Sequence, residues 1–148
     1  MNRNTLAMLV AAAVAVPGLL AAQDKATLTV EVVGVNAAKG KMEISLFKEP
    51  KGFPDTAANA IRHEFVDIDP QTVKAKVVWA DLAPGVYAVA VHHDENGNGK
   101  MDTNIIGIPK EGHGASNNPK PARRPPTFEE AQFTLAAPAQ TVEVKLDY

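Results

Sequence analysis

Short runs of apolar residues at every second position, separated by turn residues, constrain this chain more than any other feature. The clearest runs are Leu28, Val30 and Val32; Met42, Ile44 and Leu46; and Val142, Val144 and Leu146. A spacing of two residues places such side chains on one face of a strand, whereas a helix repeats about every 3.6 residues. We therefore predict an all-β fold built from short strands with one buried face.

Four further segments complete an expected set of about seven strands. They are Phe65 to Ile68, Val73 to Trp79, Val86 to His92, and Phe128 to Leu135. We expect the first two strands of the chain to pair with each other, and we expect Pro84 and Gly85 to form a type II turn. Many short strands without long helices favour an antiparallel β-sandwich over an α/β fold, with Trp79, Tyr87 and Phe133 in its core.

Composition excludes several classes of function. The chain has no cysteine, so it has no disulfide scaffold, no cysteine-ligated metal and no catalytic thiol. Lys and Arg number 15 against 17 Asp and Glu, which leaves no basic excess for binding nucleic acid. A hydrophobic content of 45% is too high for a disordered chain.

The first 22 residues have the order of a secretory signal peptide. Arg3 precedes an apolar run from Leu6 to Val16, and Ala22 ends the small-residue part. The run is shorter than the roughly 20 residues that span a bilayer, so we expect no stable membrane insertion. We predict cleavage after Ala22, a periplasmic or secreted location, and a single sandwich domain over residues 23–148. Without disulfides, packing, oligomerisation or a bound ion must stabilise this domain.

A long polar stretch without apolar periodicity, His93 to Pro126, opens on closely spaced oxygen-bearing side chains. From Asp94 it reads D-x-N-x-N-G-x-x-D, which resembles the first nine positions of a calcium-binding loop. The expected ligands are Asp94, Asn96, Asn98, the Lys100 carbonyl and Asp102, with Gly99 at the sharp turn and Asn104 in support. The stretch therefore predicts a calcium site.

Two departures from the calcium pattern leave an alternative open. Ile105 occupies the twelfth position, where a bidentate acidic residue is expected, and a strand replaces the flanking helix. We therefore expect a modest affinity, with a dissociation constant of about 10⁻⁴ to 10⁻³ M. The alternative is a plain polar turn, because Asn96-Gly97 and Asn98-Gly99 are also strong turn dipeptides.

The histidines allow a second hypothesis of another class. His92 or His93, with Asp94 and His113, would suit zinc, copper or a small metal-dependent hydrolase. Neighbouring strand residues point to opposite faces, so His92 and His93 cannot both bind one metal without a bulge. Ser116 lies in no nucleophile elbow. The Pro-rich part of the chain also carries a basic strip, which is either a solvated surface or a binding site for an anionic partner. Its residues are Lys110, Lys120, Arg123 and Arg124.

The chain resembles an exported bacterial family called domain of unknown function 2141. The resemblance is carried by Trp79 to Gly112, by Gly52-Phe53-Pro54, by Ser116-Asn117-Asn118 and by Pro126-Thr127-Phe128. His113 and Ala115 stand where the family usually has aromatic residues. The resemblance implies a single secreted domain and no assigned activity. Leu82 to Tyr87 is also similar to prealbumin-like and carboxypeptidase-regulatory-like sandwiches, which implies an immunoglobulin-like or prealbumin-like arrangement.

Together these features predict a binding or accessory module rather than an enzyme. We expect calcium as its cofactor and a protein or small molecule of the cell envelope as its partner. Association of copies through an exposed edge strand is a third possibility.

Overall fold

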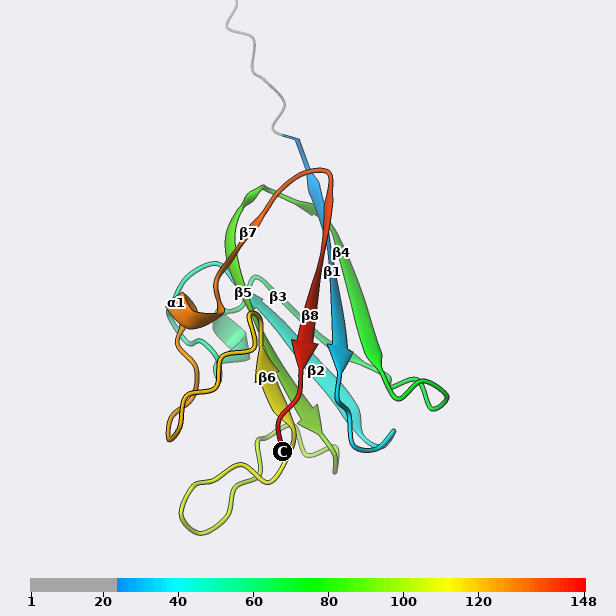
Figure 1. The fold of residues 1–148 in the computed structure, drawn as a ribbon, viewed down its shortest axis with the longest axis vertical. Helices are drawn as coiled ribbons and strands as arrows, with labels where there is room; N and C mark the ends of the chain where they lie inside the picture. Colours follow the sequence, from blue (N-terminus) through cyan, green and yellow to red (C-terminus); the bar gives the residue numbers. More distant parts are fainter. Residues whose placement is uncertain (1–23) are drawn as a thin grey trace, which may run out of the picture.

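The computed structural model describes residues 24–148, which form a sandwich of two sheets (Figure 1). The three-stranded sheet has the order β4 (Ala75–Leu82), β1 (Ala26–Val33), β8 (Ala139–Lys145). The five-stranded sheet has the order β3 (Arg62–Val66), β2 (Lys41–Phe47), β5 (Gly85–Asp94), β6 (His113–Ala115), and β7 (Phe133–Leu135) also pairs with β5. Two short helices are the 3₁₀ turn η1 (Ala57–Asn59) and α1 (Phe128–Ala131). The predicted signal peptide, residues 1–22, lies outside the described residues.

Alternating apolar side chains fill the space between the sheets, as predicted. The side chains with no exposed surface include Leu28, Val30, Val32, Met42, Ile44, Leu46, Val89, Leu135 and Val144. Trp79 and Tyr87 are also buried, and Phe133 is half-buried against the same cluster. The all-β sandwich is therefore confirmed, with eight strands.

The expected pairing of the first two strands is wrong. β1 pairs with β4 and β8, and β2 pairs with β3 and β5, so the turn between β1 and β2 crosses from one sheet to the other. The β1–β8 pair is parallel, with Val30 opposite Val142, in an otherwise antiparallel sandwich. Alternation fixes which face of a strand is buried, but it leaves the neighbouring strand open.

The connection from β4 to β5 also differs from the prediction. Gly85 opens β5 instead of supplying a positive φ, and the left-handed residue is Asp81, with φ of 59°. The Tyr87 hydroxyl donates a hydrogen bond of 2.7 Å to the Ala83 carbonyl. This contact resembles a tyrosine corner, and it holds the crossing between the two sheets.

Residues 128–135 form α1 and β7 instead of the predicted single strand. The Thr127 side chain accepts a hydrogen bond from the Glu130 backbone, and the Glu130 side chain accepts one from the Thr127 backbone, which is a capping box. Phe128 and Ala131 then cover one end of the outer face of the five-stranded sheet, where they pack with Phe47. Among residues 24–148 we find no helix with the length and apolar character that crossing a bilayer requires.

Candidate functional site

The last residues of β5 bring two polar side chains to the outer face of the five-stranded sheet. His92 lies opposite Glu43 of β2, and Asp94 lies opposite Lys41. His93 points the other way, so the prediction that the two histidines face opposite sides is confirmed. The loop between β5 and β6 starts at this edge and projects beyond the sandwich (Figure 1).

Asp94 organises the first turn of this loop. Its side chain is buried, at 2% exposure. Asp94 Oδ1 accepts hydrogen bonds from the backbone of Gly97 at 2.8 Å and Asn98 at 3.1 Å, and Oδ2 accepts one from Gly99 at 2.8 Å. Gly99 has φ of 71°, a conformation that favours glycine, and it occupies the predicted sharp turn. A single carboxylate therefore holds three consecutive backbone N–H groups.

Three of the predicted ligand side chains converge on one another. Asn98 Nδ2 donates to Asp102 Oδ1 at 3.1 Å, and Asn96 Nδ2 donates to Asp102 Oδ2. The backbone of Lys100 donates to Asn98 Oδ1 at 2.8 Å, while the Lys100 side chain is exposed. Asn104 lies apart from this group, because its Oδ1 accepts hydrogen bonds from residues 106 and 108.

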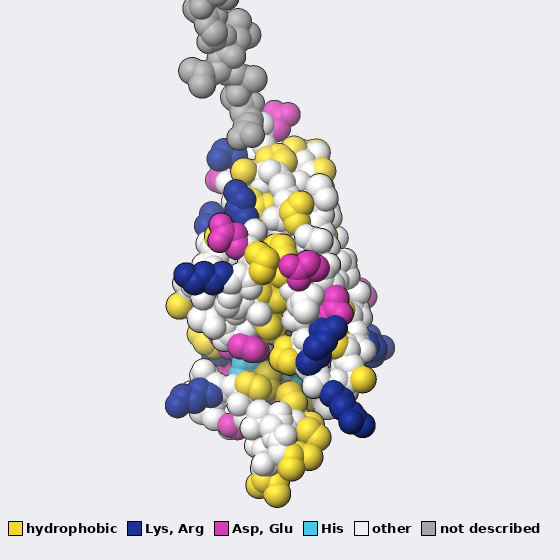
Figure 2. All heavy atoms as spheres, turned by 90° about the vertical axis from the view of Figure 1, so that its left-hand side faces the viewer, with side chains coloured by type: hydrophobic (Ala, Val, Ile, Leu, Met, Phe, Trp, Pro, Cys, Tyr) yellow, Lys and Arg dark blue, Asp and Glu magenta, His cyan; other side chains and the backbone are white. Residues whose placement is uncertain are grey.

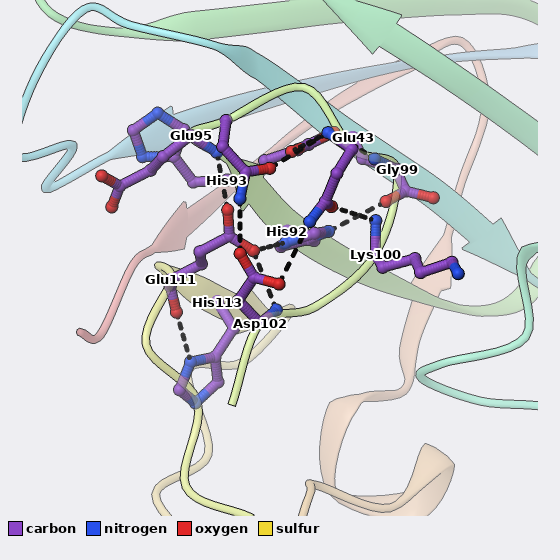
Figure 3. A network of polar contacts seen from close by, with 12 residues as sticks. Glu43, His92, His93, Glu95, Gly99, Lys100, Asp102, Glu111 and His113 are labelled. Atoms are coloured by element: carbon purple, nitrogen blue, oxygen red, sulfur yellow. Dashed lines mark hydrogen bonds and ion pairs between the residues drawn. The ribbon is translucent and has the colours of Figure 1, made fainter. Parts of the chain in front are cut away.

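Glu111, which the sequence reasoning missed, closes the base of the loop (Figure 3). It is buried, at 4% exposure. Glu111 Oε1 accepts a hydrogen bond from the Glu95 backbone at 2.9 Å, and Oε2 accepts one from the Asp102 backbone at 3.0 Å. Nothing in the sequence marks this residue, because it lies in a polar stretch without periodicity.

His92 connects the loop to a row of polar side chains across the sheet. Its Nε2 lies 2.9 Å from Glu111 Oε2 and its Nδ1 lies 3.0 Å from Glu43 Oε2. Glu43 Oε1 lies 3.6 Å from His63 Nε2, and His63 Nδ1 lies 3.0 Å from Ser45 Oγ. Burial acts to lower the pKa of His92, but hydrogen bonds to the two glutamates outweigh it and raise the pKa above its ordinary value.

His93 has a structural environment on the other side of β5. It is fully buried, and its Nε2 lies 2.7 Å from the Lys39 carbonyl while its Nδ1 lies 2.8 Å from the Tyr148 hydroxyl. A carbonyl only accepts, so Nε2 carries the hydrogen, and in the neutral ring Nδ1 then accepts from the Tyr148 hydroxyl. Next to it, the Lys39 ammonium hydrogen-bonds Glu95 at 2.6 Å and lowers the pKa of that carboxyl.

The residues of the histidine hypothesis are not brought together around one centre. His93 is on the inner face, and His113 Nδ1 lies 3.4 Å from the Glu111 carbonyl rather than near Asp94. In the part of the chain that the structure describes, no three His, Asp or Glu side chains are grouped to hold a metal ion.

Two members of the basic strip are engaged in ion pairs. Arg124 makes a two-pronged contact with Glu130, and Lys120 lies 2.9 Å from Asp147. The side chains of Lys110 and Arg123 are exposed. The strip is therefore divided between paired and exposed cations instead of forming one continuous patch.

Comparison with known proteins gives a family and no activity. Residues 30–143 match the family described as "Uncharacterized protein conserved in bacteria (DUF2141)". No curated protein and no solved structure has a significant match to the chain. The matched residues include the five-stranded sheet, most of the three-stranded sheet and the whole loop from Asp94 to Glu111. The chain therefore belongs to the DUF2141 family.

Proposed function

We propose that this protein is an exported binding or accessory module, without catalysis, whose Asp94–Asn104 loop takes up a calcium ion. The observation that carries the proposal is the convergence of the Asn96 and Asn98 amides on the Asp102 carboxylate, beside a buried Asp94. Calcium requires six to eight oxygen ligands, and carboxylates, amide oxygens and backbone carbonyls all serve. The loop supplies these types of ligand at the expected spacing.

The side chains are compatible with ion uptake after a small rearrangement. Asn96 and Asn98 turn their NH₂ groups toward Asp102, and rotation of each amide brings its oxygen to the same place, in exchange for the hydrogen bonds that these oxygens accept from the backbone of Asn98 and Lys100. Asp94 Oδ2 accepts one hydrogen bond, so it keeps a lone pair for an ion. With two ligand carboxylates and Ile105 at the twelfth position, we expect a dissociation constant of about 10⁻⁴ to 10⁻³ M.

Calorimetric titration of the metal-stripped protein with calcium tests the proposal. We expect heat of binding and a higher melting temperature in calcium than in chelator, both lost in Asp102→Asn and in Asp94→Ala. Asp69→Ala is a matched control, because Asp69 caps another turn through the backbone of Gln71 at 2.8 Å and should leave calcium binding unchanged. Absence of heat together with absence of a melting shift would contradict the calcium site.

The zinc, copper or hydrolase alternative has less support, because His92, His93, Asp94 and His113 do not converge. A zinc titration separates the two hypotheses. We expect no zinc binding that depends on His92 or His113, so His92→Gln and His113→Gln should behave like the unchanged protein. Tight zinc binding that both substitutions weaken would favour the alternative instead.

The remaining parts of the proposal concern location and relatives. Export is supported by the order of residues 1–22, and an intact mass that begins at Gln23 in protein recovered from the cell envelope would test it. The finer likeness to prealbumin-like sandwiches is supported by the Tyr87–Ala83 contact at the sheet crossing. We propose a protein or small molecule of the cell envelope as the partner.

A further inference from the structure

Residues 103–109 form a hairpin at the end of the Asp94–Asn104 loop, closed by a bridge between Thr103 and Pro109, and this hairpin carries three exposed isoleucines. Ile105 is 104% exposed, Ile106 74% and Ile108 53%. We call these three residues with Gly107 the apolar tip. Figure 2 shows hydrophobic side chains gathered at the lower end of the molecule, where this loop projects. Contiguous apolar side chains at such a position mark an interaction site, because their exposure to water is unfavourable and a binding partner would bury them.

Part of the backbone of the apolar tip is already hydrogen-bonded within the hairpin. Asn104 Oδ1 accepts from the N–H groups of Ile106 and Ile108, each at 3.0 Å, and the Gly107 N–H donates to the Asn104 carbonyl at 3.0 Å. The Asn104 N–H donates to the Ile108 carbonyl at 2.8 Å. Polar backbone groups that enter a lipid phase are best paired internally, and the N–H groups of Ile106, Gly107 and Ile108 are paired before any binding. The tip is also preorganised, which lowers the entropy cost of docking.

Positive charge flanks the apolar tip on both sides. Lys100 and Lys110 are exposed, and the sequence between residues 103 and 109 contains no charged residue. The carboxylates that flank this segment in sequence are already engaged: Asp102 is half-buried and bonded to Asn96 and Asn98, and Glu111 is buried beneath the loop. A convex apolar point with lysines behind it complements a surface that is apolar inside and anionic outside, which is the interface of a bilayer with anionic lipids.

We propose that the apolar tip inserts into the interfacial region of a bilayer that contains anionic lipids, while Lys100 and Lys110 contact the headgroups. The protein then lies on the membrane instead of spanning it. This binding goes beyond the proposed calcium site and does not need it, because the isoleucine and lysine side chains are not ligands of the loop, to which Lys100 contributes only its backbone carbonyl.

Vesicle co-sedimentation tests the proposal with the protein as recovered from expression of the full chain. The probes are vesicles of phosphatidylcholine alone and of equal parts phosphatidylcholine and phosphatidylglycerol, each in calcium and in chelator. We expect binding to the mixed vesicles in both solutions and much weaker binding to phosphatidylcholine. All variants share one N-terminus, so any contribution from residues 1–23 cancels between them.

The variants separate the tip from other exposed apolar surface. The double substitution Ile105→Ser and Ile106→Ser should weaken binding by more than about tenfold. Lys100→Glu and Lys110→Glu should each weaken it by about fivefold or more. Ile108→Ser and Val78→Ser are a matched pair, since both side chains are 53% exposed, and only Ile108→Ser should reduce binding.

Four outcomes would overturn the proposal. The first is no binding of the unchanged protein to the mixed vesicles, and the second is equal binding to both kinds of vesicle. The third is binding that the double serine variant leaves intact. The fourth is a double serine variant with a lower mass in sedimentation equilibrium than the unchanged protein, which would show that the tip contacts a second copy. Retained binding in chelator, with no calcium heat, would leave this proposal standing while the calcium proposal fails.

Discussion

Residues 95–112 and residues 116–132 both lack regular patterning, yet they lie in different relations to the sandwich. The first stretch projects from it and is held almost wholly by polar contacts through Asp94, Asn104 and Glu111. The second stretch lies against the outer face of the five-stranded sheet, where Phe128 and Ala131 join an apolar cluster. Its one fully buried polar side chain, Ser116, accepts from the Val89 backbone at 2.9 Å and donates to the Ala131 carbonyl.

This difference gives a criterion for irregular stretches: one that packs apolar side chains against the sheet supports the fold, and one that leaves them exposed is available for binding. The second stretch contributes apolar surface to the fold, so changing it should affect the stability of the whole protein. The first stretch satisfies its own backbone through a few side chains and leaves its isoleucines outside. It therefore remains available for an ion or a surface, and changes to it should act locally.

The largest expected effect comes from removing the apolar anchor of the second stretch. Phe128 is 7% exposed and packs edge-on against Phe53, with ring centroids 6.0 Å apart. Phe128→Ala should lower the free energy of unfolding by about 3 kcal/mol in urea titrations, through lost burial and a cavity. Ile108→Ala in the first stretch should change it by less than about 0.5 kcal/mol. Equal losses from the two substitutions would contradict the comparison.

A smaller effect is expected from the carboxylate at the base of the first stretch. Glu111→Ala leaves the N–H groups of Glu95 and Asp102 without their acceptor, which should cost about 2 kcal/mol. Hydrogen exchange at these two amides should accelerate before the strands exchange. Glu129→Ala, at an exposed position of α1, is the control and should change stability by less than about 0.5 kcal/mol. Unchanged exchange at both amides would rule out this role of Glu111.

The hairpin itself should respond more weakly still. Asn104→Ala removes the acceptor for Ile106 and Ile108 and should cost about 0.5 to 1 kcal/mol, because the contacts are neutral and near water. Faster hydrogen exchange confined to residues 106 and 108 would confirm local loosening. Asn104→Asp keeps an acceptor oxygen and should retain the protection; loss of protection in this variant would argue against the assigned role of Asn104.

The sequence predicted which face of each strand is buried better than it predicted which strands pair with each other. The opposite faces of His92 and His93 and the burial of Trp79 and Tyr87 follow from period-two alternation, which the structure confirms. Sheet partners depend on where distant strands meet. The parallel contact of β1 with β8 therefore has no local signal.

The candidate site was predictable only where residue spacing carries the chemistry. The Asx turns of Asp94 and the positive φ of Gly99 follow from the D-x-N-x-N-G pattern. The base at Glu111 and the short β6 strand form through tertiary contact with β5, so no periodic pattern marks them. The helix α1 does have a local signal, because Thr127 and Glu130 have the spacing of a capping box, but the apolar residues around them favour a strand when periodicity alone is considered.

The smallest expected effect is a pH dependence at the end of the second stretch. Arg124 contacts Glu130 at 2.7 and 2.8 Å, and together with the Thr127 backbone it lowers the pKa of that carboxyl from 4.5 to about 2. The folded state favours the charged form, so this contribution is complete above pH 4.5 and is lost as pH falls toward about 2. The pair is on the surface, so salt should weaken it.

An NMR pH titration of the Glu130 carboxyl carbon measures this shift directly. We expect a midpoint near 2 that rises toward 4.5 in Arg124→Gln. Glu130→Gln should make the free energy of unfolding slightly less dependent on pH in acid, because it removes one carboxyl group whose protonation destabilises the folded state. Glu95 provides the counterpart in the first stretch, where Lys39 lowers its pKa, so Lys39→Gln should raise that midpoint and leave Glu130 unchanged. A midpoint near 4.5 for Glu130 in the unchanged protein would mean that Arg124 does not hold the second stretch in solution.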